Sequence, residues 1–461
     1  MTRLSTATLA TVAPEVARPA YERAALKPGI VHLGIGAFAR AHLLPITDAA
    51  IAATGDLRWG VVGVSLRQPD TRDALAPQQG LYTLALRDAQ GTRLQVVGGL
   101  LQLLVAPEDE GAVVARIASA DTRIVSLTIT EKGYHADPGG AADLIARALQ
   151  RRRATGSGGL TLMSLDNLPS NGRALQRCVQ QRAAALDPGL ADWIDARCSF
   201  PCSMVDRIVP RTTDADRAQV AAALGIDDAW PVVGEPFLDW AVEDRFVAGR
   251  PDWTAGGARF VASAEPYEQL KLRMVNGSHS ALAYIGALLG LPTVDRAVAD
   301  ADLRGFADAL LRVEVQPTLP TLPGLDVDAY RARLLQRFAN PSLQHRLLQI
   351  AMDGSQKIPQ RWLATLRDRL AEGQGIDRLA LCVAAWLRFI DGRDEQGATL
   401  PLDDPMAEAL RAARQGADGG IGHGPVFGDL AQDARFVHAV ERASQSLART
   451  GLRPAVRALA G

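Results

Sequence analysis

The sequence predicts an α/β fold, in which a doubly wound parallel sheet is followed by a mainly α-helical C-terminal domain. The chain has 461 residues, more than one hydrophobic core usually serves, which indicates two domains. Its first half alternates short β-branched runs with helical stretches, the pattern of parallel βαβ units. Beyond about Glu265 the strand-like runs cease. We therefore expect domains at residues 1–262 and 263–461.

The N-terminal half contains four short apolar runs typical of buried parallel strands. They are Ile30–Gly36, Trp59–Leu66, Ile124–Thr130 and Leu160–Leu165. Helical patterns at 41–54 and 109–119 lie between them. Residues 81–88 and 93–105 form an extended pair joined by AQGT, which predicts a β-hairpin inserted into this domain. In the C-terminal half, helical patterns dominate, for example at 303–313 and 377–390.

Charge and composition exclude several classes of function. Lysine and arginine number 50 against 51 aspartate and glutamate, a formal net charge of −1, so no basic field attracts nucleic acid or an anionic membrane. No secretory leader and no run of about 18 apolar residues occurs, which predicts a cytoplasmic protein. The four cysteines and seven histidines show no metal-binding spacing. We expect a small-molecule partner and no metal, in a monomer or small homo-oligomer.

A glycine motif follows the first predicted strand directly. Gly34, Gly36 and Ala39 give G-x-G-x-x-A between that strand and a helix, the context of a dinucleotide-binding turn in a Rossmann-type domain. Gly34 permits a tight turn, and Gly36 lets the backbone approach a pyrophosphate. Ala39 lets the helix pack closely on the strand. The alternative is a turn that merely contains glycines, but its place between strand and helix favours a nicotinamide dinucleotide.

Residues that follow other predicted strands bear on the choice between NAD and NADP. An acidic residue at the end of the second strand binds the ribose hydroxyls of NAD, and Asp70 lies several residues beyond that end. Arg67 is closer and would favour a 2′-phosphate, so NAD is expected and NADP stays possible. Lys132 follows the strand predicted over 124–130, where open α/β sheets bind ligands, and is a further cofactor candidate.

The segment YEQLKLRMVNGSH, residues 267–279, carries the densest group of polar side chains. At about 100° per residue, Lys271, Asn276 and His279 fall within about 140° of one helical face, with Glu268 one turn before Lys271. Oxidation of an alcohol needs a base for the hydroxyl proton, and loss of hydration suits a lysine to that task. An amide such as that of Asn276 stabilises the oxygen as it becomes alkoxide-like. The alternative is an exposed helix with a Glu–Lys pair and an Asn-Gly turn.

Motifs along nearly the whole chain resemble those of the long-chain polyol dehydrogenases, the mannitol dehydrogenase family. This family includes mannitol 2-dehydrogenases and fructuronate reductases (mannonate oxidoreductases). The motifs are HLGIGAFARAH from His32, SLTITEKGY from Ser126, LDNLPSNG from Leu165, FPCSMVDRIVP from Phe200, GEPFLDWAVEDRF from Gly234, KLRMVNGSHS from Lys271 and MDGSQKIPQR from Met352. Ala39 departs from the histidine that the family often has there. The glycine turn needs a small residue at this position, so the expected cofactor binding is unaffected.

The resemblance implies a zinc-independent oxidoreductase with a Rossmann-type N-terminal domain and a helical C-terminal domain. It places the general base at Lys271, followed by Asn276 and His279 in the family pattern K-x4-N-x2-H. It also implies roles for four residues outside this pattern: Asn167 in the oxyanion pocket, Glu268 in a proton path to solvent, and Asp206 and Lys357 at the substrate.

Two substrate classes remain open under this resemblance. Mannitol 2-dehydrogenases tend to carry arginine where this chain has Gln349, whereas fructuronate reductases have glutamine there and a His-Arg pair one turn earlier, here His345 and Arg346. A carboxylate favours a guanidinium fork, and Arg346 and Arg361 are its expected partners. We expect a sugar acid of the D-mannonate/D-fructuronate type, with D-mannitol/D-fructose as the alternative. A non-catalytic nicotinamide-binding regulator is a remote alternative, which the retained base disfavours.

Overall fold

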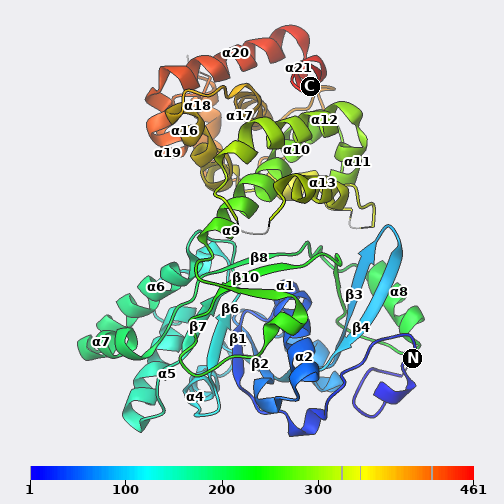
Figure 1. The fold of residues 1–461 in the computed structure, drawn as a ribbon, viewed down its shortest axis with the longest axis vertical. Helices are drawn as coiled ribbons and strands as arrows, with labels where there is room; N and C mark the ends of the chain where they lie inside the picture. The colour runs from blue at the N-terminus through cyan, green and yellow to red at the C-terminus, as the bar shows by residue number, and fades with distance from the viewer. Residues whose placement is uncertain (1, 323–324, 343, 417–418) are drawn as a thin grey trace. The chain divides into compact units, whose positions relative to one another are not determined.

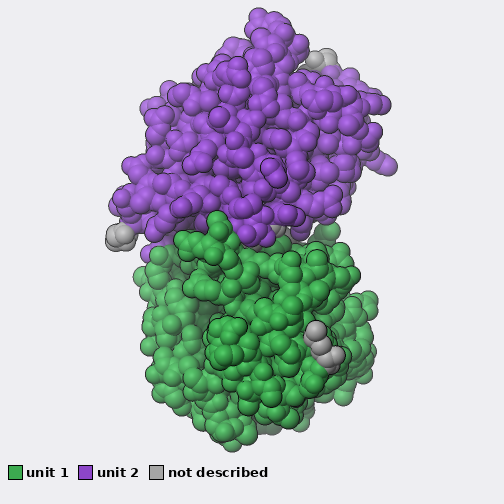
Figure 2. Space-filling view, turned by 90° about the vertical axis from the view of Figure 1, so that its right-hand side faces the viewer, with its two compact units in different colours: residues 1–265 green, residues 266–461 purple. Residues whose placement is uncertain are grey.

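The computed structural model describes residues 2–322, 325–342, 344–416 and 419–461. The chain divides into two compact units, Met1–Glu265 and Pro266–Gly461, here called unit 1 and unit 2. Figure 2 colours them green and purple. The division falls after Glu265, where the sequence predicts it after residue 262.

Unit 1 is built on a five-stranded parallel sheet with the strand order β5-β2-β1-β6-β7. Figure 1 labels β2, β1, β6 and β7 of this sheet. The strands are β1 (Ile30–Leu33), β2 (Val61–Ser65), β5 (Leu100–Val105), β6 (Ile124–Leu127) and β7 (Thr161–Ser164). All four predicted strands belong to this sheet, and every residue of β1, β2, β6 and β7 is buried. The predicted doubly wound α/β class is confirmed.

Helices cover both faces of this sheet because its strands are apolar on both sides. Ile30 and Val61 pack in one core with α2 (Leu43–Thr54). Val31 and Val62 pack in a second core with the helices of the opposite face. Those helices are α4 (Glu110–Ala118), α5 (Ala141–Thr155), α6 (Asn171–Leu186) and α7 (Pro188–Arg197).

The winding of the chain changes direction at β1. Strands β2 and β5 lie on one side of β1, whereas β6 and β7 lie on the other. The neighbouring carboxyl ends of β1 and β6 therefore form a topological switch point. Open α/β sheets bind their ligands in the crevice at this point.

The region predicted as a single β-hairpin is divided between two sheets. Strands β3 (Tyr82–Asp88) and β4 (Gly91–Val97) pair in antiparallel fashion, as predicted. The end of the predicted second strand is instead β5 of the parallel sheet. The extended strand is interrupted at Gly98 and Gly99, whose backbone amides both donate to the buried Asp48 carboxylate at 2.7 Å. The apolar pattern continues across the two glycines, so the sequence does not show this division.

Two three-stranded sheets complete unit 1, with the orders β4-β3-β9 and β11-β10-β8. Their further strands are β8 (Ser203–Asp206), β9 (Val232–Gly234), β10 (Asp239–Glu243) and β11 (Ala258–Val261). The other α-helices described in unit 1 before α9 are α1 (Ala37–Ala41), α3 (Asp70–Leu75) and α8 (Asp214–Leu224).

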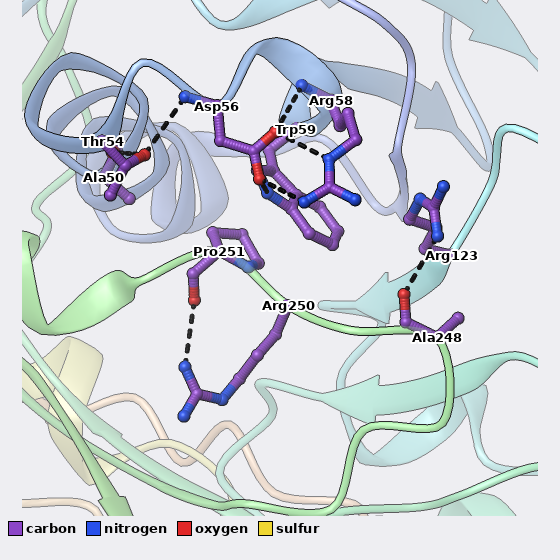
Figure 3. Close-up of polar contacts among 9 residues, drawn as sticks. All are labelled: Ala50, Thr54, Asp56, Arg58, Trp59, Arg123, Ala248, Arg250 and Pro251. Atoms are coloured by element: carbon purple, nitrogen blue, oxygen red, sulfur yellow. Dashed lines mark hydrogen bonds and ion pairs between the residues drawn. The ribbon is translucent and has the colours of Figure 1, made fainter.

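Asp56 fixes the turn that leads from α2 into β2 (Figure 3). Its carboxylate accepts from the backbone amide of Arg58 at 3.2 Å and from the Trp59 indole at 2.7 Å. The Arg58 guanidinium bonds both carboxylate oxygens. These contacts lower the pKa of Asp56 to about 2, with the Arg58 side chain as the largest cause. They also direct the buried Trp59 ring into the core beside β2.

Unit 2 is helical, and none of the strands assigned to the described residues falls in it. Its helices are α9 (Glu265–Leu270), α10 (Gly277–Leu288), α11 (Val294–Ala299), α12 (Ala301–Ala309), α13 (Val327–Phe338), α14 (Leu347–Ala351), α15 (Gly354–Ile358), α16 (Ala364–Ala371), α17 (Asp377–Ile390), α18 (Ala407–Arg414), α19 (Gly424–Phe427), α20 (Ala434–Thr450) and α21 (Leu452–Ala458). One apolar core joins them. Within the described ranges, no helix has the length and apolarity needed to cross a membrane.

Among the described residues of unit 2, three segments are π-helical, with hydrogen bonds between residues five apart instead of four. They are η7 (Lys271–Asn276), η8 (Leu310–Val315) and η10 (Pro359–Leu363). Each continues an α-helix without a break, so the helix predicted over 303–313 consists of α12 and part of η8. Single π-helical turns inside α-helices occur frequently at functional sites.

Candidate active site

A cleft of about 590 Å³ opens at the switch point of the parallel sheet in unit 1. Its volume is typical of a small-molecule site. The lining comes from three strand ends: Gly34 and Gly36 after β1, Ser65 and Arg67 after β2, and Thr128 and Lys132 after β6. The glycine motif and the strand order therefore point to the same place.

The two glycines of the motif have different reasons to be glycine. Gly34 has a φ of +92°, and a Cβ there would lie 2.1 Å from the Thr128 carbonyl oxygen. Gly36 has an ordinary φ of −83°, and a Cβ there would meet only the Gly34 carbonyl oxygen, at 3.8 Å. Gly34 is thus required by the fold. The space beside Gly36 is left open by the protein and fits the close approach of a pyrophosphate.

Ala39 is fully buried in α1 and packs in the core beneath the sheet. This agrees with the expectation that a small side chain here lets helix and strand approach.

His32 supports the glycine turn from behind. Its Nδ1 lies 2.9 Å from Ser126 Oγ and its Nε2 lies 3.0 Å from Thr128 Oγ1. The Thr128 hydroxyl donates to the Gly34 carbonyl at 2.7 Å, so it accepts from Nε2 and the Ser126 hydroxyl donates to Nδ1. Burial lowers the pKa of His32 to about 4, which keeps the ring neutral. This network was not predicted from the sequence, although His32 is the first residue of the segment HLGIGAFARAH.

The candidate cofactor-binding residues that follow β2 and β6 differ in their positions relative to the cleft. Arg67 is exposed and lines the cleft together with Thr71. Asp70 is the exposed first residue of α3 and is not among the residues that line the cleft. Lys132 lies in a short 3-10 turn after β6 and lines the cleft. His135 also lines it and was not predicted.

The loop that carries Asn167 is tied to the cleft by Asp166. The Asp166 carboxylate accepts from the backbone amides of Ile129 and Thr130, each at 2.9 Å, and from the Tyr134 hydroxyl at 2.8 Å. Asn167 follows β7 and is exposed, at the edge of the sheet where the cleft lies. Asp206, the other predicted residue of this unit, is buried at the end of β8, with 5% of its surface exposed.

The predicted catalytic segment of unit 2 is a helix, but not a uniform α-helix. The Gly277 amide bonds the Leu272 carbonyl, five residues back. In the α-helical geometry expected from the sequence, Lys271 and Asn276 would be about 140° apart. The π-helix over Lys271–Asn276 corrects this expectation. Bonding from i to i+5 brings residues five apart toward the same face. The Asn-Gly turn proposed as the alternative is absent, because Asn276 and Gly277 both have helical backbone angles.

Two buried polar atoms of this helix lack partners among the described residues. They are Asn276 Nδ2 and His279 Nε2, and both side chains are 8% exposed. A buried donor without a hydrogen bond costs about 1–3 kcal/mol and calls for a ligand or another explanation. These atoms fit a ligand that offers oxygen atoms, so the segment is not the exposed helix of the alternative hypothesis.

His279 is held between aromatic rings. It stacks on Phe338 with the ring centroids 4.1 Å apart and meets His345 edge-on at 5.6 Å. Burial lowers its pKa well below the ordinary value, and His345, Arg361, Arg337 and Lys271 lower it further. His279 is therefore neutral. The charged groups that most affect it are all positive.

A cationic cluster thus surrounds the two histidines, formed by Lys271, Arg337, Lys357 and Arg361. Lys357 joins it through His345, whose pKa is lowered by burial and then by Lys357. Arg361 donates to the buried Ser280 Oγ at 2.7 Å. Arg337 was not predicted, because it ends a helix about sixty residues away from Lys271 and belongs to no motif.

The remaining predicted residues of unit 2 lie in different surroundings. Glu268 is buried in α9, one turn before Lys271. Arg346 is exposed at the start of α14 and does not contribute to the charges that act most strongly on His279. Arg273 pairs with Asp368 at 2.6 Å and donates to the Thr318 carbonyl at 2.8 Å, which is a structural role.

Comparisons with known proteins agree with this architecture. Residues 28–255 match the family described as Mannitol dehydrogenase Rossmann domain, and residues 263–448 match the Mannitol dehydrogenase C-terminal domain. The chain is 43% identical to the D-mannonate oxidoreductase of Escherichia coli, over 96% of this chain and 98% of the relative. It is 40% identical to a mannitol 2-dehydrogenase of Phaeosphaeria nodorum, over 95% of this chain and 82% of the relative.

A solved structure extends the similarity to three dimensions. The ternary complex of Pseudomonas fluorescens mannitol 2-dehydrogenase with NAD and D-mannitol has a TM-score of 0.91 and 37% identity, covering 99% of both chains. The relatives are oxidoreductases, which sets aside the hypothesis of a non-catalytic regulator. With both of its units matched and identities of 40% or more over nearly its whole length, the chain belongs to the mannitol dehydrogenase family of oxidoreductases.

Proposed function

We propose that this chain interconverts a secondary alcohol and a ketone of a linear sugar acid of the D-mannonate/D-fructuronate type, with NAD as the cofactor and Lys271 as the base. The observation that carries the choice of substrate is the cationic cluster around His279. The enzyme class and the cofactor agree with the family. The proposal adds the choice of a sugar acid over a neutral polyol as the substrate.

Gly36, Arg67 and Lys132 would hold NAD at the cleft of unit 1. The cleft fits a dinucleotide because it lies at the switch point and because the space beside Gly36 is open. When bound, NAD supplies the hydride acceptor. Thr128 and the neutral His32 keep the glycine turn in place, and Asp166 holds the neighbouring loop.

Lys271 takes the hydroxyl proton as the alcohol is oxidised. Asn276 Nδ2 donates to the same oxygen, whose charge grows along the reaction, and such preorganised donors are each worth about 3 kcal/mol. Burial lowers the pKa of His279 well below its ordinary value, which makes it a weak base, so its Nε2 can bond a substrate oxygen without competing with Lys271 for the proton. Asn167 adds a second amide donor, and Glu268 passes the proton from Lys271 toward solvent. Asp206 binds a substrate hydroxyl.

The carboxylate of a sugar acid would be bound by the cationic cluster. The cationic side chains of Arg337, Lys357 and Arg361 near two neutral histidines leave a neutral polyol to face a positive field, which is costly where water is excluded. A carboxylate lowers this cost and gains charge-assisted hydrogen bonds. The guanidinium groups of Arg337 and Arg361 suit it best, because their planar forks match a carboxylate. Lys357 completes the set.

The test compares catalytic efficiency for D-mannonate and D-mannitol, with NAD, in the wild type and in Arg337→Leu. Charge-assisted bonds of about 1.5–3 kcal/mol predict that D-mannonate is favoured and that the substitution lowers kcat/KM for it about ten- to a hundredfold. D-mannitol should lose less than about threefold. Arg333→Leu, on an exposed face of the same helix, is the matched control and should change neither. Arg346→Leu tests the exposed candidate in the same way.

Higher efficiency with D-mannitol than with D-mannonate would make the chain a mannitol 2-dehydrogenase and end the sugar-acid proposal. Equal losses for both substrates in Arg337→Leu would remove Arg337 from carboxylate recognition. The location in the cytoplasm and the monomeric or small homo-oligomeric state stay predictions.

A further inference from the structure

We propose that Trp362 is a positioning residue for the reaction: its indole holds the π-helical turn Lys271–Asn276 in the register that brings Lys271 and Asn276 toward one face. This inference rests on the proposed function, which gives those two residues their roles. Trp362 is not one of the site residues predicted from the sequence.

The π-helical turn needs external support. A π-turn is rare and less favourable than the α-helical turn into which it relaxes when the extra residue is pushed out. In an α-helical register, Lys271 and Asn276 would again be about 140° apart. Contacts that recognise the wide turn must therefore stabilise it.

Trp362 makes such a contact at the end of the turn. Its Nε1 donates to the Gly277 carbonyl at 2.9 Å, and the side chain is 1% exposed. Gly277 is the residue immediately after η7. A Cβ at Gly277 would lie 3.2 Å from the Arg361 carbonyl oxygen and 3.6 Å from the Trp362 ring. Glycine thus allows the two segments to approach closely enough for the indole to reach the backbone.

The helix that carries Trp362 contacts the π-helical turn at a second point. Arg273, inside η7, pairs with Asp368 of α16 at 2.6 Å. Since α16 continues directly from η10, which carries Trp362, one continuous helix contacts the π-turn in its interior and at its end. Arg361 adds a third contact one turn further along α10, to Ser280 Oγ at 2.7 Å.

The helix that carries Trp362 is itself π-helical where it contacts the turn Lys271–Asn276. Pro359 opens η10 and has no amide to bond the Ser355 carbonyl. The π-helical geometry of η10 follows from this missing bond and includes Trp362. The two π-turns thus contact each other, and a hydrogen bond from Trp362 of η10 to Gly277, the residue that follows η7, links the two helices.

The test is Trp362→Phe, which keeps a ring but removes the indole N–H. Trp253→Phe is the matched control, because Trp253 is also fully buried and donates one hydrogen bond, to Thr47 Oγ1 at 3.0 Å, in unit 1. Both variants lose the same atoms and should lose similar thermal stability. A small displacement of catalytic groups can cost as much as about a hundredfold in rate. We therefore expect Trp362→Phe to lower kcat at least about tenfold, whereas Trp253→Phe stays within about twofold.

Three readouts separate positioning from a loss of stability. The KM for the ketone and the affinity for NADH should change less than about twofold in Trp362→Phe. The pH dependence of kcat should shift, because the surroundings of Lys271 change. Gly277→Ala, which crowds the Arg361 carbonyl, should reproduce both effects. Gly286→Ala on the same helix should not, because its Cβ would displace the end of the Leu347 side chain, 2.6 Å away, and would otherwise make ordinary contacts, with Ala297 at 3.5 Å and Leu291 at 3.9 Å.

An unchanged kcat and pH profile in Trp362→Phe would overturn the inference. Should this variant fail to fold, the comparison of Gly277→Ala with Gly286→Ala decides it. Lys271→Ala distinguishes the two proposals. If that variant keeps its turnover, the proposed function fails; if it is inactive while Trp362→Phe is fully active, only the positioning role of Trp362 fails.

Discussion

Acid is expected to weaken unit 1 through His32, a residue that takes no part in the proposed chemistry. His32 is completely buried and its ring lies between the hydroxyls of Ser126 and Thr128. Desolvation lowers its pKa from 6.5 to about 4. Its neutral form is therefore part of the folded state.

The sign and size of the His32 contribution to the free energy of unfolding follow from these two pKa values. Between pH 6.5 and about 4 the unfolded chain binds a proton at His32 that the folded chain does not bind. The stabilisation from His32 is fully present above pH 6.5 and is lost as the pH falls through 4. At 1.36 kcal/mol per pH unit, the total is about 3 kcal/mol.

Asp48 acts in the opposite direction over nearly the same range. Burial raises its pKa from 3.8 to about 6, against the hydrogen bonds from Gly98, Gly99 and Tyr21. Its stabilisation is complete below pH 3.8 and is lost as the pH rises through 6. The two effects offset each other in the wild type, so only a comparison with a variant isolates His32.

The assay compares the wild type with His32→Gln, using hydrogen exchange of β1 amides in urea so that unit 1 is followed alone. Between pH 7.5 and 4.5 the wild type should lose about 2–3 kcal/mol relative to the variant. His438→Gln, at an exposed site, should follow the wild type. Parallel pH dependences for the wild type and His32→Gln would refute the reasoning, since the buried ring would then titrate equally in both states.

Four further predictions concern ligands and catalysis. Gly36→Val should fold, because a Cβ there would lie 3.8 Å from the nearest protein atom, the Gly34 carbonyl oxygen, and calorimetry should show at least about tenfold weaker NAD binding. Catalytic efficiency should be higher with NAD than with NADP, and a clear advantage for NADP would reverse this expectation. Lys271→Ala should lower turnover at least about a hundredfold with nearly unchanged NAD affinity, and in the wild type an acid limb for alcohol oxidation should report this base. Chelating agents should leave the wild-type rate unchanged, and inhibition that added metal reverses would show a required ion.

The parallel sheet was predictable because each of its main strands is short and apolar on both faces. The sheet formed by β8, β10 and β11 was not, since Asp206, Asp239 and Glu243 are carboxylates buried within or at the ends of its strands. Burial of these groups depends on partners elsewhere in the chain, which no local pattern reveals. The division of the predicted hairpin likewise depends on the distant carboxylate of Asp48.

The spacing of polar residues in the sequence located the candidate catalytic segment but did not give its helical geometry. The segment from Lys271 to His279 was found because its polar residues recur within one helix. Their spacing of five and then three residues departs from the α-helical repeat, and this departure was the available sign of a π-turn. Arg337 and Trp362 could not be found, because helix packing brings them to the segment from about sixty and ninety residues away.

The two ends of the β3–β4 hairpin lie close together, beside the start of β5. Gly80, just before it, lies so close to Leu100 that a Cβ would be 2.1 Å from the Leu100 carbonyl oxygen. The tip of the hairpin at Ala89 and Gln90 is exposed. Exposed loop tips tolerate insertions well, so a fluorescent reporter or an immobilisation tag could be spliced in between Ala89 and Gln90. With both ends of the hairpin anchored together, such an addition should leave the nucleotide cleft intact.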